Sequence, residues 1–244
     1  MVSDDLISRK FKKIAEQSNI VELYNSKKFA KYYHDAINGD KDFFDDILFY
    51  KSIFTTESNV LEIGSGTGRV LIPLVDHDIN VFGIEPSIEM SSFIPNEYKE
   101  RLFSIGIEEL KRLSNFKNYF DAIIIPATSI SVFPHAVFEQ FLADSLLLLK
   151  SGGKIYFDYI KVDHFKQLDN IVNTVINNSS KFYMTNFVSD KKIIFNITDK
   201  IDFAVGIKYI YSTDYISSVA QKFNMKVIID KNLTDYMLIH LELS

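Results

Sequence analysis

The chain has 244 residues, and with 47% of them hydrophobic it can bury a full core as one domain of moderate size with little disorder. It contains no cysteine, which excludes disulfides, thiolate zinc sites and cysteine nucleophiles. A formal net charge of −5 repels phosphate backbones and disfavours nucleic acid as a main partner.

No apolar run approaches the roughly 20 residues that a membrane-spanning helix needs, so we expect no membrane segment. Residues 1–5 are acidic and lack the apolar core of a signal peptide. We therefore expect a cytoplasmic protein.

The first 55 residues place apolar side chains at helical spacing, and we expect mostly helix there, ahead of any strand. The predicted helices cover residues 5–23, 29–37 and 41–53. Tyr24, Tyr32, Tyr33 and His34 form a polar–aromatic cluster in this region. We interpret residues 1–55 as a helical lid, the alternative for each side chain being ordinary packing on a sheet.

From residue 59 onward, short apolar runs alternate with helical segments. The predicted strands cover residues 60–63, 81–84, 102–105, 122–125 and 154–159. The predicted helices cover residues 69–76, 87–93, 108–113 and 135–149. Gly152 and Gly153 are expected to give the last helix a left-handed C-cap. Such alternation is typical of a parallel sheet with both faces covered.

The alternation then stops. Three strands without intervening helices are predicted at residues 182–188, 193–198 and 203–211, and they should form antiparallel hairpins with a tight turn at residues 189–191. A helix over 214–223 and strands over 226–230 and 236–243 complete the chain. The predicted fold class is α/β: a doubly wound, seven-stranded, mostly parallel sheet in residues 56–244, with an N-terminal helical cover and an antiparallel β insertion at about 181–211.

A glycine-rich turn follows the first strand of the alternating region. Gly64, Gly66 and Gly68 permit a sharp turn, close approach of a ligand to the backbone, and close packing of helix on strand. Two carboxylates accompany the turn. Glu62 precedes it, and Glu85 ends the next strand, where it can accept both hydrogens of a ribose diol. NAD sites share this last feature, so Glu85 alone does not decide the ligand.

These segments resemble, in order over about residues 58–160, the motifs of class I S-adenosylmethionine-dependent methyltransferases. Residues 60–69 resemble motif I, and residues 85–90 (Glu-Pro-Ser-Ile-Glu-Met) resemble the family's acid-x-Ser-x-x-Met segment. Residues 120–122 and 147–157 are similar to its fourth-strand and fifth-strand motifs. The resemblance implies the family's fold, methyltransferase activity and S-adenosylmethionine as cofactor.

The resemblance also implies roles for single residues. Glu62 and the backbone of residues 64–66 would hold the methionine end, whose ammonium and sulfonium favour a carboxylate. Glu85 would bind the ribose, and Pro86 and Met90 would line the adenine pocket.

One position departs from the family pattern. The acid that usually follows Gly106 is replaced by Ile107, so its backbone amide and the charge of Glu108 are the expected substitutes. Tyr32 is a further expected contact from the lid. The predicted cofactor-binding residues are Glu62, Gly64, Ser65, Gly66, Glu85, Pro86, Met90, Ile107, Glu108 and Tyr32.

Methyl transfer is an in-line displacement, for which the protein positions the acceptor and, where needed, removes its proton. Residues 126–135 loosely resemble the corresponding loop of bacterial amino-sugar N-methyltransferases, which implies His135 as a base; the alternative is an inert histidine in the first turn of a helix. Asp158 and His164 face the expected acceptor cavity. The predicted catalytic residues are His135, Asp158 and Tyr33.

The acceptor itself stays open between an amine and a hydroxyl. The Asn-Pro-Pro-Tyr clamp of nucleobase methyltransferases is absent, and Asp121 stands at the wrong end of the fourth strand for a metal, so we expect a small-molecule acceptor and no metal. A homodimer through the inserted strands is one further option. The competing interpretations are an NAD(P)-linked oxidoreductase and a methyltransferase-like binding protein without turnover.

Overall fold

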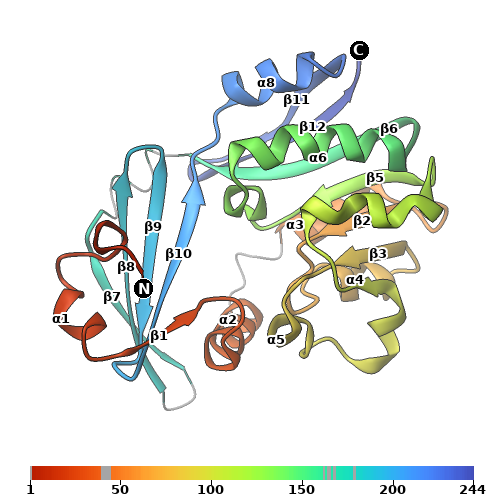
Figure 1. The fold of residues 1–244 in the computed structure, drawn as a ribbon. Helices are drawn as coiled ribbons and strands as arrows, with labels where there is room; N and C mark the ends of the chain where they lie inside the picture. Colours follow the sequence, from red (N-terminus) through yellow and green to blue (C-terminus); the bar gives the residue numbers. More distant parts are fainter. Residues whose placement is uncertain (1, 40–44, 162, 164–165, 167–168, 178–179) are drawn as a thin grey trace.

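The computed structural model describes residues 2–39, 45–161, 163, 166, 169–177 and 180–244. Two β-sheets organise this part of the chain, one of seven strands and one of five, and they stand beside each other with α2 (Lys27–Gly39) between them (Figure 1). Helix α2 also packs on α5 (Ile88–Ser91) of the larger lobe.

The larger sheet has the strand order β11-β12-β6-β5-β2-β3-β4. Strand β12 runs antiparallel to both neighbours, and the other pairings are parallel. The strands are β2 (Asn59–Ile63), β3 (Asn80–Ile84), β4 (Leu102–Phe103), β5 (Phe120–Ile125), β6 (Leu149–Ile160), β11 (Met225–Asn232) and β12 (Tyr236–Leu243). The predicted seven-stranded, mostly parallel sheet is therefore confirmed.

Alternation along the central strands fills a separate core on each face of this sheet. Leu61, Ile123 and Phe157 point to one face, whereas Val60 and Ile124 point to the other. The first face is covered by α6 (His135–Leu148), α8 (Thr213–Gln221) and the 3-10 helix η4 (Ile107–Phe116). The second is covered by α3 (Asp45–Ile53) and α4 (Leu71–Val75). Two more 3-10 helices, η3 (Asn96–Arg101) and η5 (Ser129–Val132), complete the lobe.

The smaller sheet has the order β1-β10-β9-β8-β7. Its strands are β1 (Asn19–Glu22), β7 (Val172–Asn177), β8 (Ser180–Ser189), β9 (Lys192–Thr198) and β10 (Asp202–Tyr209). The predicted antiparallel hairpins are confirmed, and Asp190 makes the tight turn with φ 52°. Phe29 of α2 packs on one face, and Phe11, before α1 (Lys12–Ala15), packs with Phe203 on the other.

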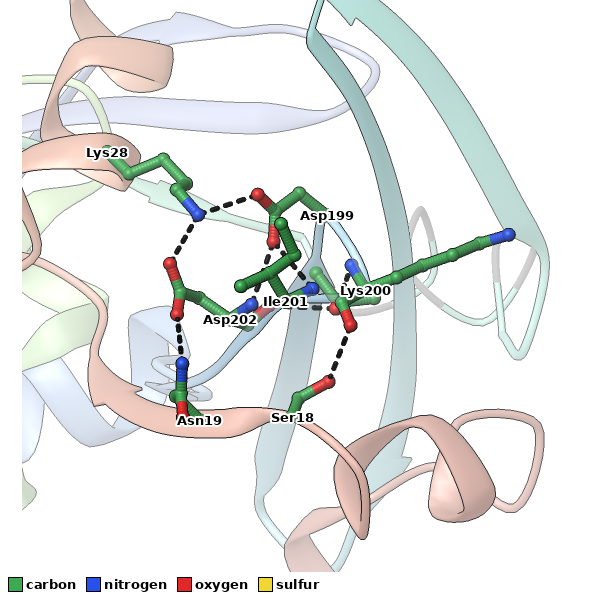
Figure 2. A network of polar contacts seen from close by, with 8 residues as sticks. Ser18, Asn19, Lys28, Asp199, Lys200, Ile201 and Asp202 are labelled. Atoms are coloured by element: carbon green, nitrogen blue, oxygen red, sulfur yellow. Dashed lines mark hydrogen bonds and ion pairs between the residues drawn. The ribbon is translucent and has the colours of Figure 1, made fainter.

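Ion pairs fix the start of α2 to the turn between β9 and β10. The Lys28 ammonium lies 2.7 Å from the carboxylate of Asp199 and also contacts Asp202 (Figure 2). Asn19 of β1 donates to Asp202 at 3.1 Å. The N-terminal segment is thus tied to the inserted sheet.

Two expectations about local structure were wrong, and one strand was not predicted. Residues 19–22 form strand β1, parallel to β10, rather than the end of a helix; Ile20 and Val21 favour the extended state beside a partner strand. Strand β7 was not foreseen. Gly152 does not cap α6, because Leu149 is already extended (φ −73°, ψ 141°) and Gly152, at φ +79°, lies in an irregular part of β6.

The prediction of helices over 29–37 and 41–53 is confirmed where it can be compared; residues 41–44 lie outside the described residues. None of the helices in the described part of the chain combines the length and hydropathy that a bilayer crossing requires.

Candidate active site

A cavity of about 310 Å³ lies at the carboxyl ends of β2, β3 and β5. The glycine turn, the loop after β3 and the loop after β5 form its wall on the larger lobe. The segment around α2 and strand β10 close it from the other side. Ligands of open α/β sheets bind at this end of the strands, where neighbouring connections diverge.

The glycine turn forms the floor of the cavity. Gly64 and Gly66 line it with φ values of +71° and +57°, in the left-handed region that glycine adopts without strain. A Cβ atom on Gly66 would come 3.4 Å from Met90 Cε, and on Gly68 2.7 Å from Ile72 Cδ1. Without a side chain, Gly66 leaves its backbone accessible to a ligand. The lack of a side chain at Gly68 lets the following helix pack closely.

Glu85 is buried at the end of β3 and lines the cavity. Its Oε2 accepts from the Gly66 N–H at 2.9 Å, and its Oε1 accepts from the Ser87 N–H at 2.8 Å. Burial raises the pKa of Glu85, while these two bonds lower it. The Ser87 hydroxyl donates to the Tyr24 carbonyl at 2.6 Å, which ties the acidic loop to the lid.

Glu62 is 1% exposed and directly precedes the glycine turn. Its Oε2 has no hydrogen-bond partner within the described structure, and burial raises its pKa to about 7. The nearby Ser65 hydroxyl and, to a smaller extent, the Arg69 guanidinium lower that pKa; Arg69 is itself paired with Asp46 through hydrogen bonds of 2.8 and 2.5 Å. A buried carboxylate oxygen without a partner is costly, and a cation bound beside it would remove that cost.

The predicted cofactor residues divide into three groups: those that line the cavity, those buried just behind its lining, and those that lie apart from it. Gly64, Gly66, Glu85, Pro86 and Met90 line the cavity. Ser65 is buried behind it against Gly83, and Glu62 lies beneath the turn.

The other three lie apart from the cavity lining. Ile107 is part of the hydrophobic core, and Glu108 is exposed. The Tyr32 hydroxyl donates to Met184 Sδ at 3.2 Å, and its ring packs on Phe182 with 4.6 Å between centroids. Tyr32 therefore supports the contact between α2 and the inserted sheet.

The predicted catalytic residues are also separated. Tyr33 lines the cavity, and burial raises its pKa. His135 is not among the residues that line this cavity: its Nε2 lies 3.0 Å from the Ile210 carbonyl oxygen, and its ring stacks on Tyr215 with 4.1 Å between centroids. His164 lies outside the described residues.

Asp158 belongs to a second cavity, of about 230 Å³. Its Oδ2 accepts from the Thr128 N–H at 2.8 Å, and its Oδ1 has no partner within the described structure. Burial, reinforced by Asp46, raises the pKa of Asp158 to about 7. Ala127 and Thr128 line both cavities, and their φ values of 58° and 56° place two non-glycine residues in the left-handed region at this shared wall.

Sequence reasoning missed several residues of this region. Lys208 reaches the first cavity from β10, and burial lowers its pKa. The only sequence signal was a single lysine within an otherwise apolar strand. Arg69 and Asp46 lie within the helices predicted over 69–76 and 41–53, and no sequence motif marks either residue as part of a site. In the described part of the chain, no group of three or more His, Asp or Glu side chains is arranged to hold a metal ion.

Comparison with known proteins agrees with this geometry. Residues 60–153 match the family model described as a methyltransferase domain. Over 140 residues the chain is 29% identical to a curated protein of Bacillus pumilus named "Uncharacterized methyltransferase", covering 53% of this chain and 62% of that protein. The chain thus spans less than two thirds of the curated relatives it matches.

Solved structures match over nearly their whole length. The CcbJ methyltransferase from Streptomyces caelestis superposes with a TM-score of 0.74 at 14% identity, covering 91% of this chain and 98% of that one. CalS10, an amino pentose methyltransferase from Micromonospora echinaspora solved with S-adenosylmethionine bound, gives 0.66 at 14% identity, with 92% and 99% covered. The chain has the class I methyltransferase fold, and the resemblance of its residues 60–153 to a methyltransferase domain, inferred from the sequence, is confirmed.

Proposed function

We propose that the protein transfers the methyl group of S-adenosylmethionine to a nitrogen or oxygen of a small molecule. The observation that carries the proposal is the pair of buried glutamates at the glycine turn: one has an oxygen without a hydrogen-bond partner among the described residues, and the other lines the cavity wall. The matched methyltransferase domain covers these same residues.

The residues present suit this cofactor. The orphaned oxygen of Glu62 offers a site for the ammonium of the methionine end, and the bare backbone at Gly64 and Gly66 leaves room for the chain above it. Glu85 stands where a ribose diol would be recognised, next to Pro86 and Met90 for an apolar base. When bound, the cofactor supplies an electrophilic methyl group on a sulfonium.

The chain's own part in the reaction would be to orient the acceptor, exclude water and accept a proton. Of the three predicted catalytic residues, Asp158 and Tyr33 border the cavities, and we favour them. His135 would first have to leave Ile210 and Tyr215. Similarity to an amino pentose methyltransferase supports a small acceptor that bears an amine. The cytoplasmic location and the homodimer stay predictions.

Calorimetric titration of ligand-free protein with S-adenosylmethionine, S-adenosylhomocysteine and NAD⁺ tests the proposal. We expect micromolar or tighter binding of the two adenosyl compounds and no heat with NAD⁺. Binding of NAD⁺ alone would point to the oxidoreductase instead. Binding of the adenosyl compounds, followed by release of S-adenosylhomocysteine only when an amine or alcohol is added, would complete the case for turnover.

A further inference from the structure

The second cavity contains one feature that its neighbours leave unexplained. Asp158 lines this cavity and is 6% exposed; its Oδ2 is fixed by the Thr128 N–H, while its buried Oδ1 has no hydrogen-bond partner among the residues that the structure describes. Burying a carboxylate in this way is unfavourable unless a donor or cation completes it. The fixed oxygen means that the free one has a defined direction.

Three cations of the described part of the chain lie near this cavity: Lys208, Arg69 and Lys231. Lys208 lines the adjoining cavity and interacts electrostatically with Asp158. Asp46 holds Arg69 in a bidentate pair, in which both side chains are largely buried. Lys231 lies over the ring of Phe49 at 5.4 Å. Of the buried carboxylates that face the cavity, Asp158 therefore has the oxygen available for a ligand.

The shape of the cavity completes the description of its ligand. Leu238, the cross-strand neighbour of Asp158, and Tyr236 supply apolar surface beside the acid, and the volume of about 230 Å³ suits a body the size of a small ring. Ala127 and Thr128 separate this cavity from the one that holds Glu85, so a ligand bound here lies next to the proposed cofactor site.

We propose that this second cavity is the acceptor site and that it selects a compact primary or secondary amine, whose ammonium donates to Asp158 Oδ1. This inference rests on the proposed function and adds to it the place where the acceptor amine binds and the contact that selects it over an alcohol. The uncharged alcohol of the same shape is the poorer ligand, because its hydrogen bond to the carboxylate is not assisted by a positive charge.

The same contact serves the reaction. Asp158 takes one proton from the ammonium and leaves a neutral amine with a free electron pair. The nitrogen–carbon bond then forms as the carbon–sulfur bond breaks, the bonding electrons stay on sulfur, and the product leaves as a methylated ammonium. The pKa of Asp158, raised to about 7, suits it to accept that proton near neutral pH.

The test uses protein saturated with S-adenosylhomocysteine and three probes that share one ring: cyclohexylamine, cyclohexanol and cyclohexanecarboxylate. Calorimetry should show cyclohexylamine as the tightest ligand. Asp158→Asn should weaken cyclohexylamine at least about tenfold and leave cyclohexanol within about twofold, since asparagine keeps the acceptor for Thr128. Asp163→Asn, the same charge change at an exposed position, should alter neither.

Lys231→Gln provides a second variant at the rim that does not depend on the folding of Asp158→Asn. Removing this cation should tighten cyclohexylamine and weaken cyclohexanecarboxylate, each about two- to fivefold. Equal binding of cyclohexylamine to Asp158→Asn, or a preference of the wild type for the carboxylate, overturns the inference. Failure of S-adenosylhomocysteine to bind the wild type instead overturns the proposed function, and cyclohexylamine titrated into ligand-free protein still tests the cavity.

Discussion

Glu62 and Glu85 are chemically identical but serve different ends. Both carboxylate oxygens of Glu85 accept hydrogen bonds from backbone N–H groups. Glu85 therefore stabilises the glycine turn and also lines the cavity. Glu62 has one buried oxygen without a hydrogen-bond partner in the part of the chain that the structure describes. Such a group stores unfavourable free energy in the ligand-free protein and releases it when a cation binds.

Replacing Glu62 by glutamine should change how the stability of the ligand-free protein depends on pH. The pKa of Glu62 is raised from 4.5 to about 7 in the folded state, so ionisation favours the unfolded chain and wild-type stability falls as pH rises from about 4.5 to 7. Glu62→Gln removes this loss. The quantity to compare is the free energy of unfolding of the variant minus that of the wild type. This difference should be about 2 kcal/mol more positive at pH 8 than at pH 5.

Urea denaturation at both pH values measures this difference. Asp158 has a similarly raised pKa, but it is present in both proteins and cancels in the comparison. An unchanged difference between the variant and the wild type across this range would show that Glu62 is not held protonated by burial.

At the scale of elements, Lys28 offers a specific test of how the lid is held. Lys28→Met removes the two ion pairs with Asp199 and Asp202. Because the lysine side chain is about one third exposed, the free energy of unfolding should fall by no more than about 1 kcal/mol. The start of α2 should nevertheless open more often. Hydrogen exchange should rise over residues 27–33 and stay unchanged over 59–63; equal exchange in both proteins would contradict this tether.

The same scale shows what the sequence could predict. Strands β2, β3 and β12 followed from short apolar runs with turn residues beside them, and hairpins β8 to β10 from alternation. Strand β1 could not be found, because Ile20 and Val21 continue a helical spacing and the strand exists only through its pairing with β10. The predicted C-cap at Gly152 failed for a similar reason. Gly152 does have a left-handed backbone, but it lies where the pairing of β5 and β6 shifts register rather than at the end of a helix.

Local motifs predicted the site residues that lie in the loops directly after the strands. The site residues that depend on packing between distant segments could not be predicted. Gly64, Gly66 and Glu85 are where the motif places them. Lys208 reaches the cavity only because the inserted sheet stands against the larger one, and Arg69 pairs with a residue 23 positions away. No local pattern encodes such contacts.

At the scale of the whole molecule, the cavity joins two lobes. Residues of the larger lobe form its floor, while Tyr24 and Lys208 come from the side of the smaller sheet. Saturation with S-adenosylhomocysteine should therefore slow hydrogen exchange over residues 205–209 of β10 as well as over 60–66. Protection confined to residues 60–153 would show that the smaller sheet is only a neighbour of the site.

The central claim, that two buried glutamates at the glycine turn bind the methyl donor, is tested most directly by titrating S-adenosylhomocysteine into ligand-free wild type, Glu85→Gln and the exposed control Glu97→Gln. The account predicts saturable binding to wild type and to Glu97→Gln with affinities within about twofold, and at least about tenfold weaker binding to Glu85→Gln. Absence of binding to wild type, or equal affinity for Glu85→Gln, would contradict it.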